Sequence, residues 1–173
     1  CEVLSNVVAS QDELHIEYGG VVPEIASRAH LECILPVIIE AIDNANISLD
    51  DIDAIAVGNR PGLIGSLLVG VAAAKTLAWT LSKPLITVDH VVAHLCAPAL
   101  NGADISYPAL GIVVSGGHTS LLLLSDVSTA VCLGKTIDDA AGEAFDKAAS
   151  ILGLGWPGGA LRDAASKKGT PVH

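Results

Sequence analysis

Two histidines spaced four residues apart are the clearest candidates for chemistry in this sequence. His90 and His94 enclose the apolar residues 91–93. On a helix, positions i and i+4 lie one turn apart, about 6 Å along the axis, and project from the same face. The pair is therefore expected either to chelate a metal ion or to be two ordinary histidines on a half-buried helix. Asp89, which precedes them, is expected either to cap the N-terminus of the helix or to orient a metal-binding histidine.

Two imidazoles do not complete a catalytic metal site, which usually has three protein ligands and an open position. The segment also lacks the Glu of the HExxH pattern, so a metallopeptidase would have no general base here. The pair alone therefore indicates at most part of a metal site.

A glycine turn joins two expected strands, 109–114 and 120–124. The residues of this turn are Ser115, Gly116, Gly117, His118 and Thr119. Because glycine has no side chain, the backbone N–H groups of such a turn can approach a phosphate or carboxylate oxygen. A hairpin turn without a ligand is the other interpretation, and His118 would then be solvated.

Acidic residues gather at the start of a helix expected over 139–152. Capping and a solvated helix face account for Asp138 and Asp139. They account less well for Asp146, which lies beyond the first turn and is a candidate acceptor for ribose hydroxyls.

Two further glycine-rich segments leave alternatives open. The loop 153–159 ends at Gly159, with Asp163 four residues later, and either abuts a planar ligand or connects two helices. The turn 61–65 follows a strand and opens a helix, where phosphates often bind. It lacks the Gly-Lys-Ser/Thr end of a Walker A motif, so close helix–sheet packing is the favoured role.

Composition excludes several classes of protein. The 173 residues carry 9 Lys and Arg against 19 Asp and Glu, a formal charge of −10, and 51% are hydrophobic. This excludes intrinsic disorder, and the apolar runs are too short for a membrane span. The acidic balance argues against this chain alone gripping a nucleic-acid backbone. Four cysteines without CxxC spacing indicate neither a zinc ribbon nor a disulfide scaffold.

Strands alternate with helices, which predicts an α/β fold. Strands are expected at 2–10, 52–57 and 84–88, and helices at 24–44, 63–81 and 90–100. The pattern restarts near residue 106 with three more strands, the third near 131–133, and a helix. We expect two parts, 1–106 and 107–173, and, because the chain has no Met, an internal piece of a longer protein.

The motifs, in this order, resemble the TsaD family, the catalytic subunit of tRNA threonylcarbamoyladenosine synthesis, formerly described as O-sialoglycoprotein endopeptidase. The matching segments are 18–30, 61–70, 90–94, 115–119, 136–147 and 156–159. The resemblance implies an actin/hexokinase-like, ribonuclease-H-like fold of two lobes, incomplete at both ends. Ala160, where the family usually has Pro, and the pair 59–60 before Pro61 depart from its pattern.

The resemblance also implies roles for residues. His90 and His94 correspond to two ligands of one divalent Fe or Zn ion, whose third protein ligand lies outside this chain. The contacts to the nucleotide-like substrate correspond to Ser115, Gly116, Gly117, His118, Thr119, Asp146, Gly159 and Asp163.

The implied reaction transfers a threonylcarbamoyl group from threonylcarbamoyl-AMP to the N6 amine of the adenosine 3′ of the tRNA anticodon. Implied partners are tRNA and TsaB-like and TsaE-like proteins, without a membrane. The implied compartment is the bacterial cytoplasm, with a mitochondrial homologue as the alternative. This chain alone is expected to be inactive. The alternative functions are a non-catalytic TsaB-like scaffold and the metallopeptidase of the older description.

Overall fold

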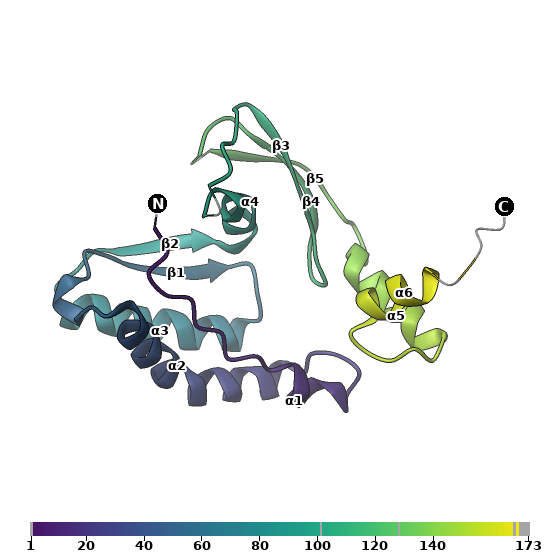
Figure 1. Cartoon of the computed structure of the whole chain (residues 1–173), viewed down its shortest axis with the longest axis horizontal. Coiled ribbons are helices and arrows are strands. Elements are labelled where there is room, and N and C mark those ends of the chain that lie inside the picture. The colour runs from purple at the N-terminus through teal and green to yellow at the C-terminus, as the bar shows by residue number, and fades with distance from the viewer. Residues whose placement is uncertain (1, 101, 128, 168, 170–173) are drawn as a thin grey trace. The chain divides into compact units, whose positions relative to one another are not determined.

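The computed structural model describes residues 2–100, 102–127, 129–167 and 169 of a mixed α/β protein (Figure 1). The chain divides into two compact units. Unit 1 comprises Cys1–Leu14 and Val22–Ala103, and unit 2 comprises His15–Val21 and Asp104–His173. The division into two lobes, 1–106 and 107–173, that was expected from the sequence remains a prediction.

Unit 1 is built on a two-stranded parallel sheet. Strand β1 (Ile55–Arg60) pairs with β2 (Leu85–Asp89), and α3 (Ile64–Thr80) makes the crossover that parallel pairing requires. Helix α3 packs on β1, and α2 (Pro23–Ala45) packs on α3 (Figure 1). The remaining elements of the first hundred residues are α1 (Asp12–Ile16), the short 3₁₀ helix η1 (Leu49–Asp51) and α4 (His90–Leu100).

Small residues allow α2 and α3 to approach closely. Ala26 and Ala29 of α2 are buried, as are Ala74 and Ala78 of α3. A Cβ added at Gly65 would collide with the side chain of Ser27. This contact supports the packing interpretation of the turn 61–65.

Unit 2 contains an antiparallel sheet followed by two helices. Strands β3 (Ala109–Val114), β4 (Thr119–Leu124) and β5 (Ala130–Lys135) lie in the order β3-β4-β5. Helix α5 (Ala141–Ile151) packs against α6 (Gly158–Ser166). One face of the sheet buries Val113, Leu122 and Leu124.

Two expectations for individual segments are wrong. Residues 2–10 form no strand, because a strand needs a neighbour and the only strand pairs within the described residues are those of the two sheets above. Asp138 and Asp139 do not cap α5, whose N-cap is Ala140. In addition, no helix in the described ranges combines the length and apolar character needed to span a bilayer.

Candidate functional site

The histidine pair opens α4 directly after β2. Asp89 Oδ1 accepts hydrogen bonds from the amides of Val91, at 2.9 Å, and Val92, at 3.3 Å. These are the N2 and N3 amides that an N-cap side chain satisfies, so the capping role expected of Asp89 is present. Its other oxygen lies 3.3 Å from Nε of Arg60, which anchors the end of β2 to the end of β1.

The two imidazoles converge. The Nε2 atoms of His90 and His94 are 3.1 Å apart, and the ring centroids are 4.4 Å apart in an edge-on arrangement. Both residues are exposed. The distance fits a hydrogen bond from a protonated Nε2 of one ring to the Nε2 of the other. It also fits two nitrogen ligands of one metal ion.

A metal ion is compatible with this geometry. Zinc–nitrogen bonds of about 2.0–2.1 Å place two ligand nitrogens about 2.9–3.4 Å apart for bond angles between about 90° and 110°. The observed 3.1 Å lies inside this range. No group of three or more His, Cys, Asp or Glu side chains suited to a metal occurs among the described residues, so this part of the chain offers two ligands.

The glycine turn between β3 and β4 is closed by its own serine. The Ser115 amide donates to the His118 carbonyl at 2.8 Å, and the His118 amide donates to Ser115 Oγ at 3.0 Å. Ser115 Oγ also donates to that carbonyl at 3.2 Å. The Ser115 side chain therefore shapes the turn in this structure.

The two glycines of the turn present their backbone outward. Both are exposed, and no atom lies within 4 Å of a Cβ built at Gly116 or Gly117. Within the described part of the chain, neither amide has a hydrogen-bond acceptor. Outward amides of this kind can receive an anionic oxygen. Beside the turn lies a hollow of about 420 Å³, lined by Gly117, His118, Thr119, Ser120, Lys135, Thr136 and Ile137.

The N-terminus of α5 is fastened to this turn. The Ala141 amide donates to Thr119 Oγ1 at 2.8 Å, and the Gly142 amide donates to the Ser115 carbonyl at 3.1 Å. Side chain and backbone of the turn thus satisfy two of the amides that a helix leaves unpaired at its start.

A charged cluster follows on the same helix. Lys147 Nζ donates to Asp139 Oδ1 at 2.6 Å and lies 3.2 Å from Glu143 Oε1. These two hydrogen bonds raise the pKa of Lys147 above its usual value of 10.5. The backbone carbonyl of Asp139 also accepts a hydrogen bond from Thr136 Oγ1 at 2.6 Å. Both the side chain and the backbone of Asp139 are therefore hydrogen-bonded.

Asp146 has a partner within the protein. Its Oδ1 accepts the Gly158 amide at 2.7 Å, across the loop that joins α5 to α6. A Cβ at Gly158 would lie 2.6 Å from that of Ala149, so α6 starts in direct contact with α5.

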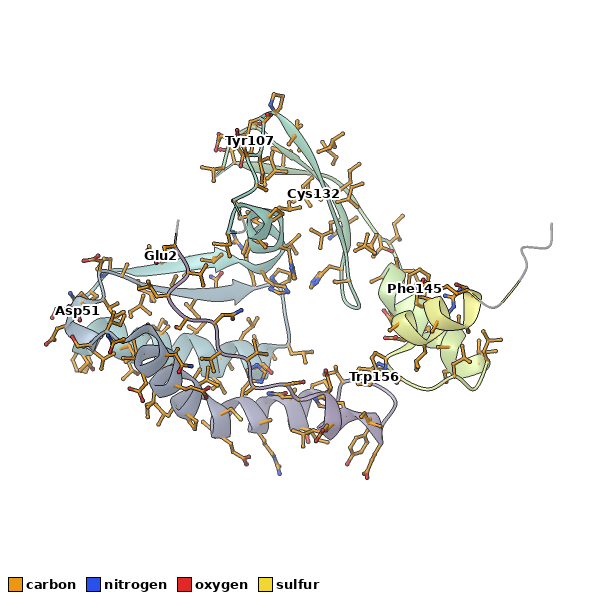
Figure 2. All side chains as sticks on the ribbon, viewed as in Figure 1. Glu2, Asp51, Tyr107, Cys132, Phe145 and Trp156 are labelled. Atoms are coloured by element: carbon orange, nitrogen blue, oxygen red, sulfur yellow. The ribbon has the colours of Figure 1, made fainter. Side chains whose placement is uncertain are left out.

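Gly159 and Asp163 share a hollow of about 270 Å³ with Phe145, Arg162 and Ser166. The Arg162 guanidinium lies 4.8 Å from the centre of the Phe145 ring, which is labelled in Figure 2. Asp163 also pairs with Lys167 at 2.7 Å. A cation over an aromatic face gives this hollow a flat, charged wall.

Apart from Asp146, the predicted residues fall into three groups. His90 and His94 are together in unit 1. In unit 2, the turn residues form one group, and Gly159 and Asp163 another, while Asp146 fastens α6 to α5.

The sequence motifs did not single out the other residues that line these hollows, which are Ser120, Lys135, Thr136, Ile137, Phe145, Arg162 and Ser166. Their only sequence signal is proximity to the glycine motifs. Gly142, also missed, has a clearer signal, because an isolated glycine inside an expected helix costs stability and can mark a close contact.

Comparison with known proteins gives consistent results. A family model described as TsaD, tRNA N6-adenosine threonylcarbamoyltransferase, matches residues 2–173. A relative from Syntrophomonas wolfei is 56% identical over 167 residues, 96% of this chain and 49% of the relative. One from Kosmotoga olearia is 51% identical over 172 residues, 99% of this chain and 52% of the relative. Both are named tRNA N6-adenosine threonylcarbamoyltransferase, and the chain spans about half the length of the curated relatives it matches.

Among solved structures, YeaZ from Pseudomonas aeruginosa covers 60% of this chain and 53% of its own, with a TM-score of 0.42 and 20% identity. This likeness is too low to bear on fold or function. The family assignment depends instead on the family model and the curated relatives, and by both the chain belongs to the TsaD family of tRNA N6-adenosine threonylcarbamoyltransferases.

Proposed function

We propose that the protein containing this chain transfers a threonylcarbamoyl group from threonylcarbamoyl-AMP to the N6 amine of the adenosine 3′ of the tRNA anticodon. The observation that carries this proposal is the convergence of the His90 and His94 Nε2 atoms, 3.1 Å apart, in a chain of the TsaD family. The family match supplies the reaction class, and the convergent pair is the chemical feature that such a transferase would use.

The histidines would hold one divalent Fe or Zn ion, together with a third ligand from outside the described residues. When bound, such an ion supplies Lewis-acid polarisation of the carbonyl that is attacked. The chain's own contribution is to fix the two donors, since Asp89 caps the helix whose first residue is His90.

The glycine turn would bind the leaving nucleotide. In the transfer, N6 forms a bond to the carbamoyl carbon and loses a proton, and the bond from that carbon to the phosphate oxygen breaks to release AMP. The outward amides of Gly116 and Gly117 would donate to the phosphate as its charge develops. His118 and Thr119 line the hollow beside them.

The second hollow would receive the adenosine portion. Gly159 and Asp163 line it, with Phe145 and Arg162 as the flat wall. Asp146 would act mainly by holding α6 in place, because its Oδ1 already accepts the Gly158 amide.

The complete protein would adopt the actin/hexokinase-like fold of two lobes. The formal charge of −10 supports tRNA binding through other segments or through TsaB-like and TsaE-like partners, because phosphate contacts need Lys and Arg. The bacterial relatives support a bacterial cytoplasmic protein.

A chimera tests the proposal. This chain replaces the matching segment of the Syntrophomonas wolfei relative, and the chimera is supplied with tRNA, threonylcarbamoyl-AMP and the partner proteins of that organism. We expect threonylcarbamoyladenosine in digests of the tRNA, detected by mass spectrometry, and none without threonylcarbamoyl-AMP. A folded chimera that forms no product, while the unaltered relative does, would contradict the proposal.

A further inference from the structure

The backbone of Gly142 lies against the backbone of the glycine turn. A Cβ built on Gly142 would lie 2.6 Å from the Ser115 carbonyl oxygen and 2.7 Å from both the Ser115 carbonyl carbon and the Gly116 nitrogen. Ordinary contact begins at 3.4 Å, and the obstructing atoms are backbone, so no rotation of a side chain relieves the collision. Any larger residue would push the turn and α5 apart.

Two hydrogen bonds hold the start of α5 against the glycine turn. The Gly142 amide donates to the Ser115 carbonyl at 3.1 Å, and the neighbouring Ala141 amide donates to Thr119 Oγ1 at 2.8 Å. One bond holds the first residue of the turn and the other holds the last. The outward amides of Gly116 and Gly117 lie between these two attachment points.

The helix is held independently at its other end. The Gly158 amide donates to Asp146, and the buried residue Gly158 lies against α5 at Phe145 and Ala149. Helix α5 thus connects the glycine turn to the start of α6, and both connections depend on a glycine without room for a side chain.

From these contacts we propose that Gly142 is a positioning residue for the nucleotide. Its missing side chain sets the position of the Gly116 and Gly117 amides relative to α5, and thereby their distance from an anionic oxygen bound at the turn. The claim that Gly142 positions the nucleotide rests on the proposed function. The claim that Gly142 positions the amides of the turn does not.

Gly142→Ala in the chimera tests this inference, with Gly134→Ala as the matched control. Gly134 lies on a strand of the same unit, and a Cβ there meets no atom within 4 Å. The probe is AMP, followed in glycine-selective ¹⁵N spectra and by calorimetry. We expect Gly142→Ala to shift the Gly116 and Gly117 amide signals before AMP is added and to weaken AMP binding at least tenfold, because misplacement by about 1 Å is costly for oriented contacts. Gly134→Ala should change neither property.

If Gly142→Ala leaves the Gly116 and Gly117 signals unchanged, the inference is overturned, whatever the affinity for AMP. If those signals shift but AMP binds as before, the positioning of the nucleotide is overturned. If the chimera and its control bind no AMP at all, the nucleotide site of the proposed function fails, and the positioning of the nucleotide fails with it.

A second variant applies if Gly142→Ala does not fold. Thr119→Val removes the hydroxyl that accepts the Ala141 amide and nearly keeps the shape of the side chain, and because Thr119 also lines the hollow, only the signals before AMP is added are compared. The same displacement of the Gly116 and Gly117 signals is expected, and unchanged signals would again overturn the inference.

Discussion

The carboxylate of Asp146 accepts the amide of Gly158 at 2.7 Å, twelve residues further along the chain. The sequence suggested that Asp146 accepts hydrogen bonds from ribose, and the structure shows that it links α5 to the start of α6. The first requirement of this contact between helices is an acceptor oxygen, and the negative charge of the carboxylate strengthens the hydrogen bond at the start of α6.

Asp146→Ala should loosen the start of α6, because the amide of the buried residue Gly158 loses its acceptor, at a cost of about 1–3 kcal/mol. Hydrogen exchange at the Gly158 amide measures this, and the exchange rate should rise. Asp146→Asn keeps an acceptor oxygen and should preserve most of the protection. If Asn exposes the amide as fully as Ala does, linking α5 to α6 is not the role of Asp146.

Asp89→Ala should destabilise the first turn of α4 by about 1 kcal/mol, because the Val91 and Val92 amides lose their cap. The helix start that carries His90 would then fray, which amide exchange at these two residues would reveal. Asp89→Ser supplies another capping oxygen and serves as the control. Equal exchange in all three proteins would contradict the capping role.

Ser48→Ala should raise the pKa of Asp51. The side-chain hydrogen bond from Ser48, followed by that from its backbone amide, lowers this pKa from the usual 3.8. The charged carboxylate therefore stabilises the fold above about pH 3.8, and this contribution is lost as the pH falls through the lowered pKa. A carbon-detected NMR titration of Asp51 measures the change, and an unaltered midpoint in Ser48→Ala would refute the assigned cause.

The regular elements were predictable because their signals are local. The spacing of apolar residues over 24–44 predicts a helix, and α2 occupies Pro23–Ala45. Residues 2–10 have a strand-like composition but no pairing partner among the described strands, and pairing is not encoded locally. The wrong capping interpretation of Asp139 has a similar origin, because its charge is engaged by Lys147, eight residues away.

The site was predictable as a set of motifs but not as a set of roles. Residue spacing placed His90 and His94 on one helix face, and the structure brings their Nε2 atoms to 3.1 Å. Spacing could not show that Ser115 closes its own turn or that Gly142 abuts the backbone of that turn. The contact of Gly142 joins the start of α5 to a turn more than twenty residues earlier, through the hydrogen bonds from the Ala141 and Gly142 amides to that turn.

The most direct test of the proposed transferase is to remove both imidazoles from the active chimera. His90→Ala combined with His94→Ala should abolish bound Fe or Zn, measured by elemental analysis, and lower the rate of threonylcarbamoyl transfer at least a hundredfold. Lys75→Ala, an exposed change on α3, serves as the control and should leave both quantities unchanged. A folded double variant that retains its metal and modifies tRNA at the unaltered rate would contradict the role assigned to the pair.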